Sequence, residues 1–140
     1  MNILDKTKKR LEEYPQLSSE VLEAEHYECI TIKPKSNGGF TVSLYLYKDG
    51  EFQVGGDGWR YEMEDLKDDE DAIKKFILCL SNKSRLKVLS RGDKEYRWDI
   101  EVENNGKWRQ DTVVIDMPAF LSCFWKKRVE RIFQNNYIRK

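Results

Sequence analysis

The chain has few of the side chains that most often build catalytic or metal centres. It contains one histidine, His26, and three cysteines, Cys29, Cys79 and Cys123, in 140 residues. The cysteines are odd in number, widely spaced and free of any CxxC pairing, which favours packed thiols in a reducing compartment over a disulfide framework. We therefore expect no metal site, no catalytic residue pair around the histidine and no cofactor.

Long apolar segments are also missing. No run approaches the roughly 18 apolar residues that a membrane-spanning helix needs, and the opening MNILDKTKKRLEEY is too charged for a signal peptide. The 25 basic and 25 acidic side chains cancel, so no overall field attracts the protein to nucleic acid or to a membrane. The sequence thus predicts a cytoplasmic protein with no membrane partner, for which nucleic acid is not the expected partner.

The charges are nevertheless segregated along the chain. Residues 61–71 carry seven acids and one base, whereas residues 126–140 carry six bases and one acid. Aromatic residues make up 12% of the chain, a content that argues against disorder. Any electrostatic function is therefore expected in local patches on a folded protein.

The first half of the chain reads as a helix, a group of strands and a second helix. A short surface helix is expected over residues 2–14, and alternation with a period of two over HYECITIK and FTVSLYLY predicts strands. Asp49-Gly50 predicts a type I′ hairpin turn into EFQV. In DDEDAIKKFILCLSNK apolar residues recur at helical spacing, so a helix should begin at Asp68 or Asp69 and end near residue 82.

The second half repeats this order of elements. RLKVLS and EYRWDIEVE are expected strands around a turn at residues 92–93, and Asn105-Gly106 predicts a type I′ hairpin into KWRQDTVVID. A final helix is expected from Met117-Pro118 onward, with an apolar side that extends to Phe133.

Together these elements predict an α+β fold in one domain over residues 1–140, a length sufficient for a hydrophobic core. The N-terminal helix over 2–14 would precede two βββα halves, over 26–82 and 85–137. The strands would form antiparallel sheet or sheets, with the helices packed on one face.

The glycine-rich stretch VGGDGWR, residues 54–60, stands out locally. It lacks the GxxxxGK[ST] spacing of a phosphate loop and the third glycine of a dinucleotide fingerprint. With the turn at Asp49-Gly50, Leu44 would face Gly55, and the return strand would continue through the glycines. We interpret the glycines as a bend in this strand or as the site of a close approach by another element.

Acidic side chains follow this stretch directly. Those of residues 68–71 suit a helix start and pairs with Lys74 and Lys75, and a calcium loop would need a central glycine that is missing. The remaining carboxylates, interleaved with aromatics, predict a docking surface for a basic protein, formed by Asp57, Trp59, Tyr61, Glu62, Glu64 and Asp65. The alternative stays open that Trp59 and Tyr61 are core residues and that the acids only solvate the surface.

In the stretch WRYEMEDLKDDEDAIKKF, an expected strand at the edge of a sheet is followed by a helix whose first turn is acidic. The chain around it is a small α+β protein of hairpins that lacks catalytic motifs. In these features the chain resembles the immunity proteins of bacterial polymorphic-toxin and contact-dependent inhibition systems. The resemblance implies a single-domain inhibitor, not an enzyme, that binds a cognate toxin domain, often a basic nuclease, and blocks its active site.

Three other functions remain open. The bases of residues 126–131 on the predicted final helix, with Trp125 or Tyr137 for stacking, would suit a nucleic-acid-associated protein. The 25 carboxylates leave room for an acid/base enzyme site. An uncharacterised interaction domain, a monomer or a homodimer formed through a sheet edge, is the third alternative.

Overall fold

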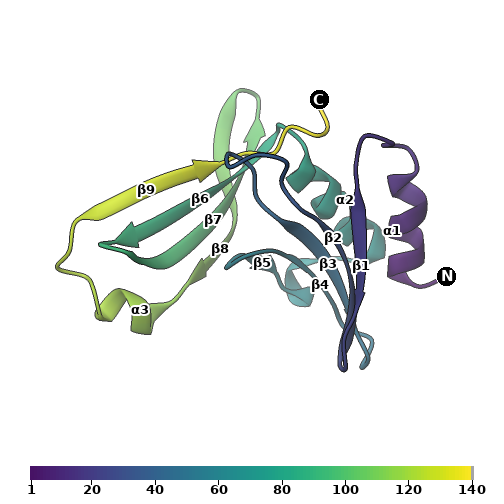
Figure 1. The fold of residues 1–140 in the computed structure, drawn as a ribbon, viewed down its shortest axis with the longest axis horizontal. Coiled ribbons are helices and arrows are strands. Elements are labelled where there is room, and N and C mark those ends of the chain that lie inside the picture. The colour runs from purple at the N-terminus through teal and green to yellow at the C-terminus, as the bar shows by residue number, and fades with distance from the viewer. Residues whose placement is uncertain (140) are drawn as a thin grey trace.

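The computed structural model describes residues 1–139, and in this range the chain forms two antiparallel sheets and three α-helices (Figure 1). The first part of the chain contains α1 (Ile3–Leu11), β1 (Ser19–Glu23), β2 (Tyr27–Ile32), β3 (Val42–Tyr47), β4 (Phe52–Gly55), β5 (Arg60–Tyr61), the 3₁₀ turn η1 (Met63–Asp65) and α2 (Asp69–Leu80). The second part contains β6 (Ser84–Arg91), β7 (Lys94–Asn104), β8 (Lys107–Ile115), α3 (Met117–Leu121) and β9 (Arg128–Phe133). The predicted α+β class is confirmed.

The first sheet has the strand order β1-β2-β3-β4-β5, and its helix side forms most of the core. Ile30 of β2 pairs with Leu44 of β3, which pairs with Val54 of β4, and all three side chains are fully buried. Helices α1 and α2 pack against these strands (Figure 1). Because side chains alternate along a strand, every second residue lies on the opposite, open face of this sheet.

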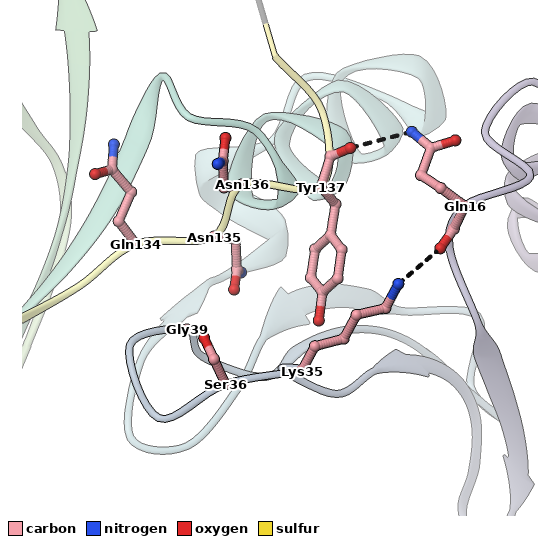
Figure 2. A pocket seen from close by; sticks show the side chains of 8 residues that line it. All are labelled: Gln16, Lys35, Ser36, Gly39, Gln134, Asn135, Asn136 and Tyr137. Atoms are coloured by element: carbon pink, nitrogen blue, oxygen red, sulfur yellow. Dashed lines mark hydrogen bonds between the residues drawn. The ribbon is translucent and has the colours of Figure 1, made fainter.

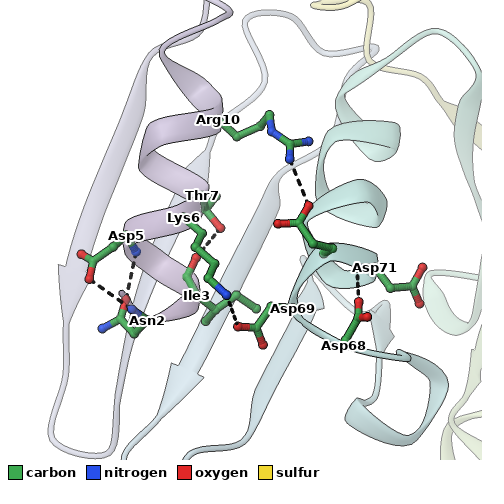
Figure 3. Close-up of polar contacts among 10 residues, drawn as sticks. Asn2, Ile3, Asp5, Lys6, Thr7, Arg10, Asp68, Asp69 and Asp71 are labelled. Atoms are coloured by element: carbon green, nitrogen blue, oxygen red, sulfur yellow. Dashed lines mark hydrogen bonds and ion pairs between the residues drawn. The ribbon is translucent and has the colours of Figure 1, made fainter.

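Helix α2 begins as predicted, since the Asp68 carboxylate accepts a hydrogen bond from the Asp71 N–H at 2.9 Å. Figure 3 shows how the next acids tie α2 to α1: Lys6 pairs with Asp69 at 3.1 Å and Arg10 with Glu70 at 3.0 Å. Most of the acidic run is therefore used to start and anchor a helix.

The expected ion pairs within α2 are not formed. Glu70 pairs with Arg10 of α1, and Lys75 pairs with Asp111 of β8 at 2.7 Å. Long-range partners replace the local ones because α2 lies between α1 and the second sheet.

The hairpin between β3 and β4 differs from the prediction by one residue. Tyr47 donates its N–H to the Glu51 carbonyl at 2.8 Å, which leaves a three-residue loop with Gly50 at φ 94° instead of a type I′ turn at Asp49-Gly50. Leu44 consequently faces Val54, not Gly55. The type I′ turn at residues 105–106 is confirmed by φ angles of 55° and 76°.

The strands beside this hairpin also differ from the prediction. Strand β1 was not expected, and it pairs with β2 from Ser19 to Glu23. The return strand β4 stops at Gly55, and the chain reverses so that Arg60 of β5 pairs with Gly55. The glycines therefore form a turn between two strands, where a continuous strand was predicted.

The predicted final helix is wrong beyond its first turn. Only Met117–Leu121 is helical, and residues 128–133 form β9, which pairs antiparallel with β6. The second sheet has the order β8-β7-β6-β9. Because β6 has an open edge on this side, strand pairing can satisfy the backbone of residues 128–133. The alternative function of nucleic-acid binding depended on a basic helix, and this helix is not formed.

The two sheets share one core. Leu86, Val88 and Ile100 of the second sheet belong to the same buried cluster as the helix side of the first sheet. The sheets are also linked where Thr112 of β8 donates a hydrogen bond to the Arg60 carbonyl at 3.1 Å. None of the helices within residues 1–139 has the length and apolarity to cross a membrane.

Candidate binding surface

The two aromatic residues of the predicted docking surface lie in the core. Trp59 is 1% exposed and Tyr61 is 2% exposed. Tyr61 pairs with Val54 and therefore points to the helix side of the sheet, and the Trp59 ring lies 5.7 Å from that of Phe40. Their side chains are not available for docking, as the second interpretation of the sequence predicted, so the surface keeps only its acids.

The structure separates these acids as well. Asp57, in the turn between β4 and β5, lines a hollow of about 270 Å³ together with Trp98 of the second sheet. Asp65 lines a different hollow, beside Lys75. Glu62 and Glu64 line a third hollow and are the two predicted acids that share one hollow.

The hollow at Glu62 and Glu64 is strongly acidic. It has a volume of about 240 Å³ between the β3–β4 loop and η1 and is lined by Tyr47, Asp49, Glu51, Phe52, Gln53, Glu62, Met63 and Glu64. Within the part of the chain that the structure describes, four carboxylates and no base line it. The Asp49 carboxylate holds the loop by accepting the Glu51 N–H at 3.0 Å. Such a hollow attracts a cationic group of a partner.

Another hollow, of about 390 Å³, adjoins the acidic hollow and shares Tyr47, Gln53 and Glu62 with it. We call it the tyrosine hollow. Three half-buried tyrosines on the open face of the first sheet form its wall. The ring of Tyr27 lies 5.4 Å from that of Tyr45 and 5.8 Å from that of Tyr47. We call the combined surface the tyrosine–acid face; its members are Tyr27, Tyr45, Tyr47, Asp49, Glu51, Glu62 and Glu64.

Tyr45 and Tyr47 of this face keep their hydroxyl protons at neutral pH. Burial raises the pKa of Tyr45 above 10.0, although a hydrogen bond with Ser43 works in the opposite direction. Burial also raises the pKa of Tyr47, whose hydroxyl donates to the Gln53 side chain at 2.9 Å. The rings therefore offer apolar area and neutral hydrogen-bonding groups.

One base moderates the charge of the face. Arg60 forms an ion pair with Glu62, and among residues 1–139 it is the only base that lines either hollow. The Glu62 N–H is held by the Asp65 carboxylate at 3.2 Å. The pair between Arg60 and Glu62 lies at the surface, where solvent screens it, so it does not cancel the acidic character of the hollow.

The glycines of VGGDGWR form one wall of the tyrosine hollow. A Cβ on Gly58, which has φ 89°, would lie 2.4 Å from the Trp98 ring, and one on Gly56 would lie 2.2 Å from the Thr41 carbonyl oxygen. A close approach by another element was one of the two expected reasons for these glycines. The approaching groups are an indole of β7 and a backbone carbonyl.

Tyr45 and Tyr47 were missed as surface residues, although the signal was in the sequence. In FTVSLYLY the tyrosines alternate with Val42, Leu44 and Leu46, so the two sets of side chains point to opposite faces of the sheet. If the aliphatic side chains face the core, the tyrosines lie on the open face. Asp49 was considered only as part of a turn and Glu51 only as the start of the return strand. Their approach to η1 is a tertiary contact that no local pattern indicates.

The other residues considered as candidates for catalysis or metal binding do not line the acidic hollow or the tyrosine hollow. Within residues 1–139 no group of three or more His, Cys, Asp or Glu side chains could hold a metal ion. His26 is largely exposed, near Glu25, and the cysteines are buried. Asp111 accepts hydrogen bonds from Tyr61 at 2.5 Å and from Lys75 at 2.7 Å. Burial strongly raises the pKa of Tyr61, which keeps it neutral, so this cluster ties α2, β5 and β8 together.

Figure 2 shows a further hollow, of about 290 Å³, lined by Gln16, Lys35, Ser36, Gly39, Gln134, Asn135, Asn136 and Tyr137. Its polar groups hold the C-terminal segment in place. Asn135 accepts the Phe40 N–H and donates to the carbonyls of Phe40 and Cys79, each at 3.0 Å. Gln16 donates to the Tyr137 carbonyl at 3.0 Å. The hollow is therefore a structural junction.

Comparison with protein-family models, with curated proteins and with solved structures gives no match.

Proposed function

We propose that the chain is a cytoplasmic binding protein of the immunity type, which binds a basic toxin domain through the tyrosine–acid face and blocks its active site. It acts by occupying that site and carries out no reaction itself. The proposal combines the resemblance of the sequence to such inhibitors with a surface that suits a basic partner.

The observation that carries the proposal is the acidic hollow joined to the tyrosine wall. Four carboxylates line a hollow that has no base among its lining residues within 1–139, Arg60 pairs with one of them from the adjoining hollow, and three tyrosine rings stand beside it. Acids that only kept the protein in solution would not need to converge on one hollow beside aromatic rings. The three buried free thiols fit a reducing compartment.

The two parts of the face have different roles in binding. Tyrosine rings supply contact area with little loss of conformational freedom, which makes tyrosine a frequent anchor of interfaces. Carboxylates accelerate the encounter with a cationic channel, because a channel that binds phosphates also attracts other anions. A basic domain would thus be recognised by its charge and held by aromatic contacts.

The test begins with capture of the partner from cells of the native host, followed by purification of the captured domain. We expect Glu62→Lys combined with Glu64→Lys to weaken binding to this domain by about 10- to 100-fold. Tyr45→Ala combined with Tyr47→Ala should weaken it while leaving the salt dependence unchanged. Calorimetric titration at low and raised salt measures both effects.

A matched control carries the same change of charge elsewhere. Glu12→Lys combined with Glu13→Lys reverses two exposed acids near the end of α1, outside the face, and should leave affinity unchanged. Growth of cells that express the partner domain tests inhibition, because the wild-type chain should restore growth and the Glu62/Glu64 variant should not. Unchanged affinity in that variant would remove the face from the proposal.

A further inference from the structure

Large apolar side chains are exposed at the far end of the second sheet. The exposed fractions are 50% for Met117, 60% for Leu121, 54% for Phe124 and 66% for Trp125. We call residues 91–94 and 117–131, which contain these side chains, the distal tip. Isolated exposed apolar residues are ordinary, but several at one place indicate an interaction site.

The distal tip lies at one end of the long axis of the molecule, where α3 leads through a loop into β9 (Figure 1). This loop is held by the β6–β7 hairpin. Arg91 donates hydrogen bonds to the carbonyls of Phe124 at 3.3 Å and Lys126 at 3.1 Å, and the Gly92 N–H donates to the Lys127 carbonyl at 3.1 Å. The apolar side chains are thus presented by a fixed loop at a projecting end.

The distal tip also carries more basic than acidic side chains. The distal tip contains Arg91, Lys94, Lys126, Lys127, Arg128 and Arg131 against Asp93 and Glu130, so its net charge is +4. Glu130 is itself paired with Lys87 at 3.6 Å. The chain is neutral overall; residues 126–131 alone supply four of these bases, and the fold adds Arg91 and Lys94 of the β6–β7 hairpin.

The combination favours one kind of partner. Nucleic acid would use the bases and Trp125 but has no use for Met117 and Leu121. Two copies meeting through this end would bring equal positive charges together. An anionic bilayer takes up both the apolar and the basic side chains, because aromatic and aliphatic groups enter the interface while Lys and Arg stay at the head groups.

We propose that the distal tip binds anionic phospholipid bilayers, with Leu121, Phe124 and Trp125 inserted at the interface and Lys126 and Lys127 at the head groups. This contact is peripheral, and it differs from the sequence expectation of no membrane partner because that expectation used the net charge of the whole chain and the absence of a membrane-spanning apolar run. The tyrosine–acid face lies on the other sheet, so the proposal is independent of the proposed function.

Flotation of the full chain with vesicles tests the proposal. We expect binding to vesicles of phosphatidylcholine mixed with phosphatidylglycerol, much weaker binding to phosphatidylcholine alone, and release as salt is raised. Tryptophan emission should shift to the blue on binding, and this shift should be lost when Trp125 is replaced by serine.

Two double variants separate the apolar and basic contributions. Phe124→Ser with Trp125→Ser should lower the partition coefficient by about tenfold or more. Lys126→Gln with Lys127→Gln should lower it by about 30-fold at low salt. Val21→Ser with Leu22→Ser, on the exposed strand β1, changes two equally exposed apolar residues and should have no effect.

Three outcomes would overturn the proposal. The first is absence of binding to anionic vesicles by a folded wild-type chain. The second is binding of a single-stranded oligonucleotide that depends on Lys126 and Lys127 while the vesicles stay unbound. The third is concentration-dependent self-association that Phe124→Ser with Trp125→Ser abolishes, again without vesicle binding.

Discussion

The two sheets of this protein are covered in different ways. The first sheet has α1 and α2 on one side, and the residues between them, such as Phe76 and Trp59, are almost completely buried. The second sheet shares this core through its inner face, but on its outer face α3 covers only Leu89 and Tyr96. The amount of helix available, more than the apolar content of the strands, decides which side chains reach solvent.

Charged pairs also lie on the outer face of the second sheet. Arg85 and Lys87 pair with Glu101 at 2.7 and 3.3 Å, and Arg97 pairs with Asp99 at 3.0 Å. Glu101 and Asp99 are largely buried between neighbouring strands, where they are screened less than at an open surface. The first sheet thus depends on apolar burial, whereas the outer side of the second depends partly on charge.

The largest expected difference between the two regions is that between two tryptophans. Trp59→Ala should lower the free energy of unfolding by about 3–5 kcal/mol, because it empties a packed site of the core. Trp125→Ala, at a 66% exposed position of the distal tip, should change it by less than about 0.5 kcal/mol. Urea denaturation followed by circular dichroism measures both. Similar losses in the two variants would contradict the division into a covered and an uncovered region.

The second largest expected effect on stability is that of adding a methyl group at Gly58, where the two sheets meet. Gly58→Ala places a Cβ against the Trp98 indole at a positive φ, which we expect to cost about 2–4 kcal/mol. Gly50→Ala is the matched control, since Gly50 has a similar φ of 94° but open space around it. It should cost only about 1 kcal/mol. Thermal unfolding compares them, and equal losses would mean that the contact with Trp98 contributes nothing.

The smallest effect concerns the acid sensitivity of the second sheet. Burial raises the pKa of Glu101, but hydrogen bonds and charges from Arg85 and Lys87 outweigh it and hold the pKa below the ordinary value of 4.5. A carboxylate with a depressed pKa in the folded state stabilises the fold above its unfolded pKa. This stabilisation is lost as the pH falls from 4.5 through the lower folded value.

Glu101→Gln should therefore reduce stability by about 1–2 kcal/mol at neutral pH and flatten the decline of stability in acid. Glu95→Gln changes an exposed acid of the same strand and serves as the control. Urea midpoints between pH 7 and pH 3 give the comparison. If the stability of Glu101→Gln falls as steeply with decreasing pH as that of the wild-type chain, the charged pairs do not stabilise the second sheet.

Local patterns were reliable where the structure depends on neighbouring residues. Helix α2 begins at the Asp68 cap, and the turn at Asn105-Gly106 has both φ angles positive, as expected from residues that tolerate that conformation. The predicted position of the turn after Tyr47 was wrong by one residue, because Asp49-Gly50 fits both a two-residue turn and a three-residue loop. That single step moves each residue of β4 opposite a different neighbour.

The residues of the candidate site were harder to predict from the sequence than the secondary structure. Glu62 and Glu64 were expected on the surface and do line the acidic hollow, but Trp59 and Tyr61 were placed there as one of two alternatives and proved to be core residues. Alternation shows that Tyr61 and Glu62 lie on opposite faces. It does not show which face the helices cover, because that depends on how α2 packs.

The sequence by itself determined the α+β class, the start of α2, the type I′ turn at residues 105–106 and the separation of acids from bases, since each follows from local conformational preference or composition. Tertiary structure decided the state of residues 128–133, which have helical spacing of apolar side chains yet form β9 on the free edge of β6. Apolar periodicity describes one segment alone, whereas a strand needs a partner that lies far away in the chain. The same long-range packing decided which aromatics are buried and brought Arg91 and Lys94 to the other bases of the distal tip.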